Sequence, residues 1–175
     1  MAEVLLRRHL ERVGVEATVS SAGLYEGGAP ATDHGIAAMA DRGLDLSGHT
    51  SRRLSDDMVR RADLVIAMTR FHAREAAVLQ PDTLRKTFTL KELARGAAVA
   101  GPRGGDESFE EWLGRIAAQR STSALLGVGH NEELDVADPV GGSRADYEAT
   151  ADLLDRLLGE VVGLAFPLVN EGRSA

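Results

Sequence analysis

The stretch Leu64-Val65-Ile66-Ala67-Met68 decides the fold class, because it is a short and unbroken run of apolar residues. A strand with one face in water alternates apolar and polar side chains, so an unbroken run is typical of a strand covered on both faces. Residues 70–79 follow with a helical pattern, and Pro81 lies just past their end. A buried strand that leads into a helix predicts a parallel sheet with helices on both faces.

The flanking segments continue this alternation of strands and helices. Residues 15–21 are alternating and β-branched, which predicts a strand, and residues 87–90 predict a weaker one. A capping box at Ser108 and Glu111 predicts a helix start, and Ser143 is a cap for the last helix. In total, we expect further helices at residues 2–13, 32–42, 56–61, 91–95, 109–120 and 144 to about 165. The glycine-rich residues 96–106 predict a mobile loop.

Composition limits the possible functions. The 175 residues suffice for one domain with a substantial core, which we place at 1–165, with a flexible tail at 166–175. A net charge of −7 argues against a nucleic-acid binder. No apolar run reaches membrane-spanning length and no signal segment opens the chain, so we expect no membrane contact and a cytoplasmic location. The sequence contains no cysteine, which excludes thiol nucleophiles and zinc–thiolate sites within it, and its histidines lack ligand spacing; we predict no metal and no cofactor.

One candidate catalytic group lies in the segment 135–142, Asp-Val-Ala-Asp-Pro-Val-Gly-Gly. Pro139 fixes its own φ and pushes Asp138 toward an extended conformation, and the two glycines allow a sharp turn before the last helix. A carboxylate that projects from a stiff turn is a plausible general acid. Asp-Pro is also ordinary turn chemistry, so the residues alone leave both interpretations open.

The helix at 2–13 has no strand before it. In parallel sheets a helix connects two neighbouring strands, and ligands bind at the carboxyl ends of the strands. We therefore expect a truncated α/β domain that lacks its first strand and the strand-to-helix turn after it.

Several motifs in order carry a resemblance to a known family. They are Met-Ala-Glu-Val-Leu-Leu-Arg-Arg at 1–8, Val-Ser-Ser-Ala-Gly at 19–23, Asp-Leu-Ser-Gly-His at 45–49, Ala-Asp-Leu-Val-Ile-Ala-Met at 62–68, and the Asp-Pro before the last helix. Over residues 1–165 the chain resembles the low-molecular-weight protein-tyrosine phosphatases, with 97–134 longer than the minimal pattern. The resemblance implies a three-layer αβα, flavodoxin-like fold with an open parallel sheet, whose central first strand and phosphate loop are missing here.

The resemblance also implies roles for individual residues. In the family, a loop with a cysteine and an arginine binds the phosphoryl group, and a carboxylic acid protonates the leaving group and later activates water. Asp138 matches that general acid and base. Ser21 matches a hydroxyl that braces the loop, and His49 matches a histidine of the same network; without the resemblance they are a strand-end hydroxyl and a turn residue. Tyr25 lies in the loop that lines the family's substrate cleft, although an exposed loop tyrosine fits it equally well.

The implied activity is hydrolysis of phosphotyrosine or aryl phosphate esters through a cysteinyl-phosphate, with a phosphotyrosine protein or a small aryl phosphate as partner. Because the nucleophile and the arginine are absent, we expect this chain to be inactive without that loop. Val140 and Gly141 stand where family members often carry aromatic residues, which leaves the substrate class open. A non-catalytic binding or regulatory relative is the alternative. Arsenate reduction, known for thioredoxin-linked enzymes of the same fold, ranks last because it needs several redox cysteines.

Overall fold

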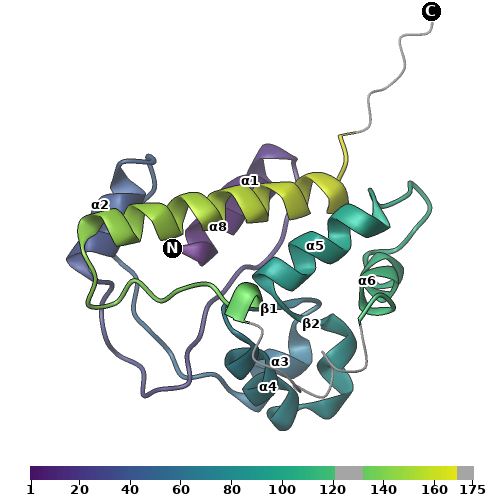
Figure 1. The fold of residues 1–175 in the computed structure, drawn as a ribbon, viewed down its shortest axis with the longest axis horizontal. Coiled ribbons are helices and arrows are strands. Elements are labelled where there is room, and N and C mark those ends of the chain that lie inside the picture. The colour runs from purple at the N-terminus through teal and green to yellow at the C-terminus, as the bar shows by residue number, and fades with distance from the viewer. Residues whose placement is uncertain (121–131, 169–175) are drawn as a thin grey trace, which may run out of the picture.

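Two parallel strands and the helices around them make up the fold of residues 1–120 and 132–168, which this computed structural model describes (Figure 1). Strand β1 (Val65–Ala67) pairs with β2 (Thr87–Thr89), with Val65 opposite Thr87 and Ala67 opposite Thr89. The helix α4 (Arg70–Leu79) and the 3₁₀ helix η1 (Pro81–Lys86) connect the two strands. The predicted buried strand and the helix after it are confirmed.

The long helix α8 (Arg144–Ala165) organises the helical part of the molecule. It packs against α1 (Ala2–Arg12), α2 (Asp33–Ala40) and α5 (Leu90–Ala100). Its buried side chains recur every three to four residues, so one face of the helix joins the core. These side chains are Tyr147, Ala151, Leu154, Leu157, Leu158, Val161, Val162 and Ala165.

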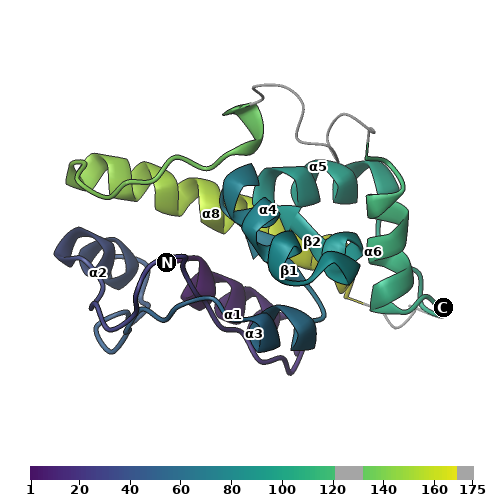
Figure 2. The same ribbon diagram turned by 90° about the horizontal axis from the view of Figure 1, so that it is seen from below.

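Helix α6 (Phe109–Ala117) covers the outer side of α5, and it lies at the opposite end of the molecule from α2 (Figure 2). Trp112 is fully buried there, and its indole Nε1 donates to the Gly101 carbonyl at 3.0 Å. The short elements α3 (Asp56–Arg61) and η2 (Glu132–Leu134) complete the described structure. Helix α6 falls within 97–134, the segment that we predicted to be an insertion.

Helix starts follow the predicted capping chemistry. Ser108 and Glu111 form the predicted capping box of α6, and Ser143 caps α8 together with Asp146. Ser55 likewise accepts the Met58 N–H at the start of α3. These caps are confirmed because they depend only on residues within one helical turn.

Two local predictions are wrong. Residues 15–21 form no strand, because an extended segment becomes a strand only when a neighbour pairs with it, and none of the described residues does so. The loop predicted to start at residue 96 is helical up to Ala100. Gly96 serves close helix packing instead: a Cβ there would lie 2.5 Å from Cγ2 of Ile116 on α6.

Parts of two other predictions lie outside the described residues: 121–131 of the segment 97–134, and 169–175 of the tail. Within the described ranges, none of the helices is both long and apolar enough to cross a bilayer.

Candidate active site

Asp138 stands on a turn at the carboxyl end of β1. The Val136 N–H donates to the carbonyl of Met68 at 2.8 Å, which attaches the segment directly behind the strand. Asp138 Oδ1 accepts the Val140 N–H at 3.0 Å, and Gly141 has a φ of 82°, a value that L side chains rarely adopt. Asp138 is exposed. The stiff turn predicted around Asp138 is therefore present, and it lies where open α/β sheets bind ligands.

Asp135 anchors the start of this turn, a role that the sequence reading missed. Its Oδ1 accepts the backbone N–H of Arg70, the first residue of α4, at 2.8 Å, and lies 3.8 Å from the Arg70 Nε. A carboxylate is stabilised at a helix N-terminus, where backbone N–H groups point outward. Lys91 Nζ donates to the Asp135 carbonyl at 2.7 Å. A carboxylate three residues before Asp138 was the available signal, but its partner is far away in the sequence.

A second polar group surrounds the first turn of α1. Ser21 Oγ donates to Oε2 of Glu3 at 2.6 Å, and Arg7 donates to Oε1 at 2.7 Å. Burial raises the pKa of Glu3, but the hydrogen bonds from Ser21 and Arg7 and the charges of Arg7 and His49 outweigh it, so this pKa lies below its usual value. Ser21 therefore bonds the Glu3 carboxylate directly. Glu3 itself was not predicted as a site residue.

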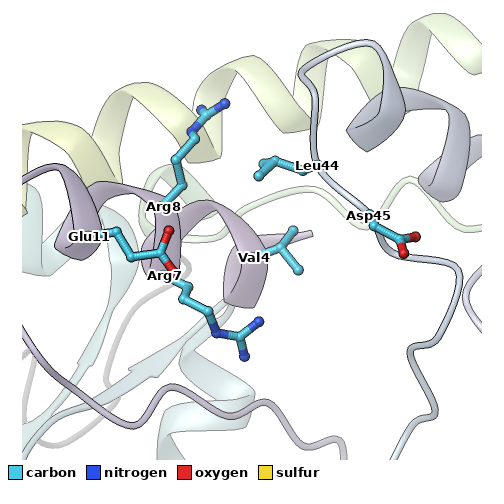
Figure 3. A pocket seen from close by; sticks show the side chains of 6 residues that line it. All are labelled: Val4, Arg7, Arg8, Glu11, Leu44 and Asp45. Carbon is cyan, nitrogen blue, oxygen red and sulfur yellow. The ribbon is translucent and has the colours of Figure 1, made fainter.

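A shallow pocket of about 120 Å³ lies beside α1, lined by Val4, Arg7, Arg8, Glu11, Leu44 and Asp45 (Figure 3). The arginines at 7 and 8 point in opposite directions in this view. Arg7 is bonded to Glu3, and Arg8 reaches Asp155 on α8 at 2.6 Å. Both cations therefore already have carboxylate partners. None of the predicted site residues lines this pocket.

The four predicted site residues are not all brought together by direct bonds. Ser21 is bonded to Glu3, whereas Asp138 belongs to the turn behind β1. Within 1–120 and 132–168, no hydrogen bond joins Asp138 to Ser21, His49 or Tyr25. The Tyr25 side chain is 88% exposed, and its role as a cleft wall stays a prediction. The same part of the chain contains no group of three or more His, Cys, Asp or Glu residues arranged to hold a metal.

Sequence relatives of the chain are phosphatases. A family model described as low molecular weight phosphotyrosine protein phosphatase matches residues 1–127. A protein-arginine-phosphatase of Bacillus subtilis is 31% identical over 162 residues, which cover 92% of this chain and 84% of the relative. A probable low molecular weight protein-tyrosine-phosphatase, EpsP of Ralstonia solanacearum, is 35% identical over 127 residues, which cover 72% and 83%.

Solved structures agree with the sequence relatives. A mutant of YwlE from Bacillus subtilis matches with a TM-score of 0.65 at 29% identity, covering 92% of this chain and 85% of that one. The solution structure of a low molecular weight protein tyrosine phosphatase from Bacillus subtilis gives a TM-score of 0.67 at 29% identity, covering 93% and 85%. With its parallel strands enclosed by helices, this chain has the three-layer α/β fold of these neighbours, and it belongs to the low molecular weight phosphotyrosine protein phosphatase family.

Proposed function

We propose that residues 1–120 and 132–168 form the general-acid side and the supporting framework of a protein phosphatase that hydrolyses phosphotyrosine or aryl phosphate esters. The observation that carries this proposal is the position of Asp138, on a turn that Val136 bonds to Met68, the residue directly after β1. A carboxyl group at the carboxyl end of a parallel strand faces the region where such folds bind ligands. Family membership supports phosphoryl transfer as the chemistry.

The proposed enzyme also needs a cysteine, which is absent from the 175 residues. We propose that a strand beside β1, with a cysteine-bearing phosphate-binding loop after it, completes the site. Among the described residues β1 pairs only with β2, so its other edge is available to such a strand. The loop would lead to the first turn of α1, where helix N–H groups favour an anion and where Ser21 and Glu3 lie. A solved cysteine-to-serine mutant of the YwlE arginine phosphatase, 29% identical, carries a phosphorylated active-site serine.

In the proposed mechanism, the cysteine thiolate attacks phosphorus and the bond from phosphorus to the leaving oxygen breaks. Asp138 gives its proton to that oxygen and becomes a carboxylate. The carboxylate then takes a proton from a water molecule that attacks the phosphorus. The bond between sulfur and phosphorus breaks, inorganic phosphate leaves, and the thiolate and the protonated Asp138 are restored.

Phosphoarginine is a second candidate substrate. The Bacillus subtilis relative that covers 92% of this chain is named a protein-arginine-phosphatase. Asp138 is followed by Pro139, Val140 and two glycines, so no aromatic ring is available in this turn to stack on a phenol. With a phosphoarginine substrate, the proton from Asp138 would go to the leaving nitrogen. A non-catalytic binding protein is the remaining alternative.

A chimera tests the proposal. The N-terminal strand and phosphate loop of the Bacillus subtilis relative would be joined ahead of Met1, and turnover measured with an aryl phosphate, a phosphotyrosine peptide and a phosphoarginine peptide. We expect phosphate release, with the ratio between the two peptides identifying the substrate class. Asp138→Ala should lower kcat by about 10²–10⁴ on esters with poor leaving groups. Asp106→Ala, which removes an exposed carboxylate elsewhere, is the matched control.

Two results would contradict the proposal. A folded chimera that releases no phosphate from any substrate would favour the non-catalytic relative. An active chimera in which Asp138→Ala leaves kcat unchanged would mean that Asp138 is only a turn residue.

A further inference from the structure

We propose that Asp135 and Lys91 are positioning residues that hold the general acid Asp138 in place. This inference rests on the proposed function, because it assigns the two residues to the same reaction. Neither residue is expected to touch the substrate. They act by holding the backbone from which Asp138 projects.

Asp135 connects the acid turn to the helix that follows β1. Its carboxylate accepts the Arg70 N–H at 2.8 Å, and this N–H belongs to the first residue of α4. The helix N-terminus and the Arg70 guanidinium, whose Nε lies 3.8 Å away, both favour a negative charge at this point. Thr69, the N-cap of α4, uses its hydroxyl for the His72 N–H instead. Asp135 therefore provides the acceptor for the Arg70 N–H, a donor at the N-terminus of α4 that the Thr69 hydroxyl does not bind.

Lys91 connects the same residue to the helix that follows β2. It lies in the first turn of α5, and its Nζ donates to the Asp135 backbone carbonyl at 2.7 Å. The next N–H along the chain, that of Val136, donates to Met68 O at 2.8 Å. One short segment is thus bonded to Met68, directly after β1, and to the first turns of the two helices that follow the strands. This is the part of the sheet that a bound phosphoryl group would face.

Asp138 depends on this anchoring, because within 1–120 and 132–168 its own carboxylate bonds only a local partner. Its Oδ1 accepts from Val140, two residues away, so that bond travels with the turn and does not attach it to the rest of the protein. A general acid must reach the leaving atom within about 2.6–3.2 Å. A displacement of about 1 Å can lower a rate about 10²-fold. Release of Asp135 should therefore slow proton transfer without removing the acid.

The test uses the active chimera, measured with aryl phosphates of increasing leaving-group pKa. Loss of a general acid matters most for poor leaving groups, so this dependence reports proton donation and not overall stability. We expect Asp135→Ala and Lys91→Met to lower kcat/KM, which reports the steps up to departure of the leaving group, about 10–100-fold on the poorest leaving group, with little change on the best one. Asp135→Asn keeps an oxygen that can accept the Arg70 N–H and should restore most of the activity. Asp106→Ala is the control.

A second measurement uses the 175-residue chain itself. Amide hydrogen exchange at Arg70 and Val136 should become faster in Asp135→Ala, and exchange at Val136 should become faster in Lys91→Met, relative to Asp106→Ala. Asp135→Asn is the control for loss of folding. It should keep both the slow amide exchange and the thermal unfolding transition of the unaltered chain.

The outcomes separate this inference from the proposed function. If Asp138→Ala makes the leaving-group dependence steeper and Asp135→Ala does not, the positioning role is wrong while the proposed function stands. If Asp138→Ala itself has no effect, both are wrong. Unchanged amide exchange in Asp135→Ala and Lys91→Met would also overturn the positioning role, because the turn would then be held by other contacts.

Discussion

Gly159→Ala should destabilise the protein even though alanine favours a helix more than glycine does. Gly159 lies within α8, opposite the His9 ring of α1. A Cβ at this position would lie 2.9 Å from Cε1 of the ring and 3.4 Å from both ring nitrogens. The ring must therefore move. It is held by Asp155, whose Oδ1 lies 2.6 Å and whose carbonyl oxygen lies 3.1 Å from His9 Nε2.

Two opposing terms set the magnitude. Replacing glycine by alanine inside a helix stabilises by about 1 kcal/mol. Losing a hydrogen bond to a charged group costs about 1.5–3 kcal/mol. Since the His9 side chain is only 15% exposed, water replaces this bond poorly. The free energy of unfolding should therefore fall by about 0.5–2 kcal/mol in Gly159→Ala.

Urea unfolding followed by circular dichroism measures this change in two backgrounds. In His9→Ala the ring is absent, so Gly159→Ala should instead stabilise by about 1 kcal/mol. Gly163→Ala is the matched control, because a Cβ at Gly163, in the same helix, would meet nothing within 4 Å. It should stabilise in both backgrounds. If Gly159→Ala has the same sign with and without His9, the crowding argument is refuted.

Two further predictions concern partly buried charges. Arg120→Met should lower the free energy of unfolding in urea by about 1.5–3 kcal/mol, because it removes a charged hydrogen-bond partner of Glu92. The Arg120 side chain is 7% exposed and that of Glu92 25%; Arg120 bonds Glu92 at 2.8 Å and lies 4.0 Å above the Phe88 ring. A loss below 1 kcal/mol would contradict this. Glu3 has a folded pKa below its usual value, so its stabilisation is present above about pH 4.3 and is lost as the pH falls through the folded pKa. Stability should therefore fall less steeply in Glu3→Gln than in the unaltered chain between pH 5 and 3, and parallel curves would count against the assignment.

Local sequence chemistry determined the elements that depend on close neighbours. The apolar run at 64–68 predicted β1, and the pattern at 70–79 predicted α4, because side-chain periodicity reflects one element's own faces. The capping residues Ser108 and Ser143 identified two helix starts for the same reason. The turn at Asp138 was also predictable, since proline and glycine restrict the backbone locally.

The sequence could not determine features that depend on distant partners. Residues 15–21 have strand character, but strand formation needs a neighbour, and none of the described residues pairs with them. Gly96 resembled a loop residue, yet its missing side chain admits Ile116 from another helix.

The same division applies to the candidate site. The sequence by itself determined that Asp138 projects from a stiff turn before the last helix, because that property is encoded in adjacent residues. Only the tertiary structure decided where the turn lies: Val136 bonds Met68, and Asp135 bonds Arg70 and Lys91, across 65 and 44 residues of chain for the latter two. Hydrogen bonds over such separations cannot be predicted from side-chain periodicity, because they depend on how the strands and helices pack in space.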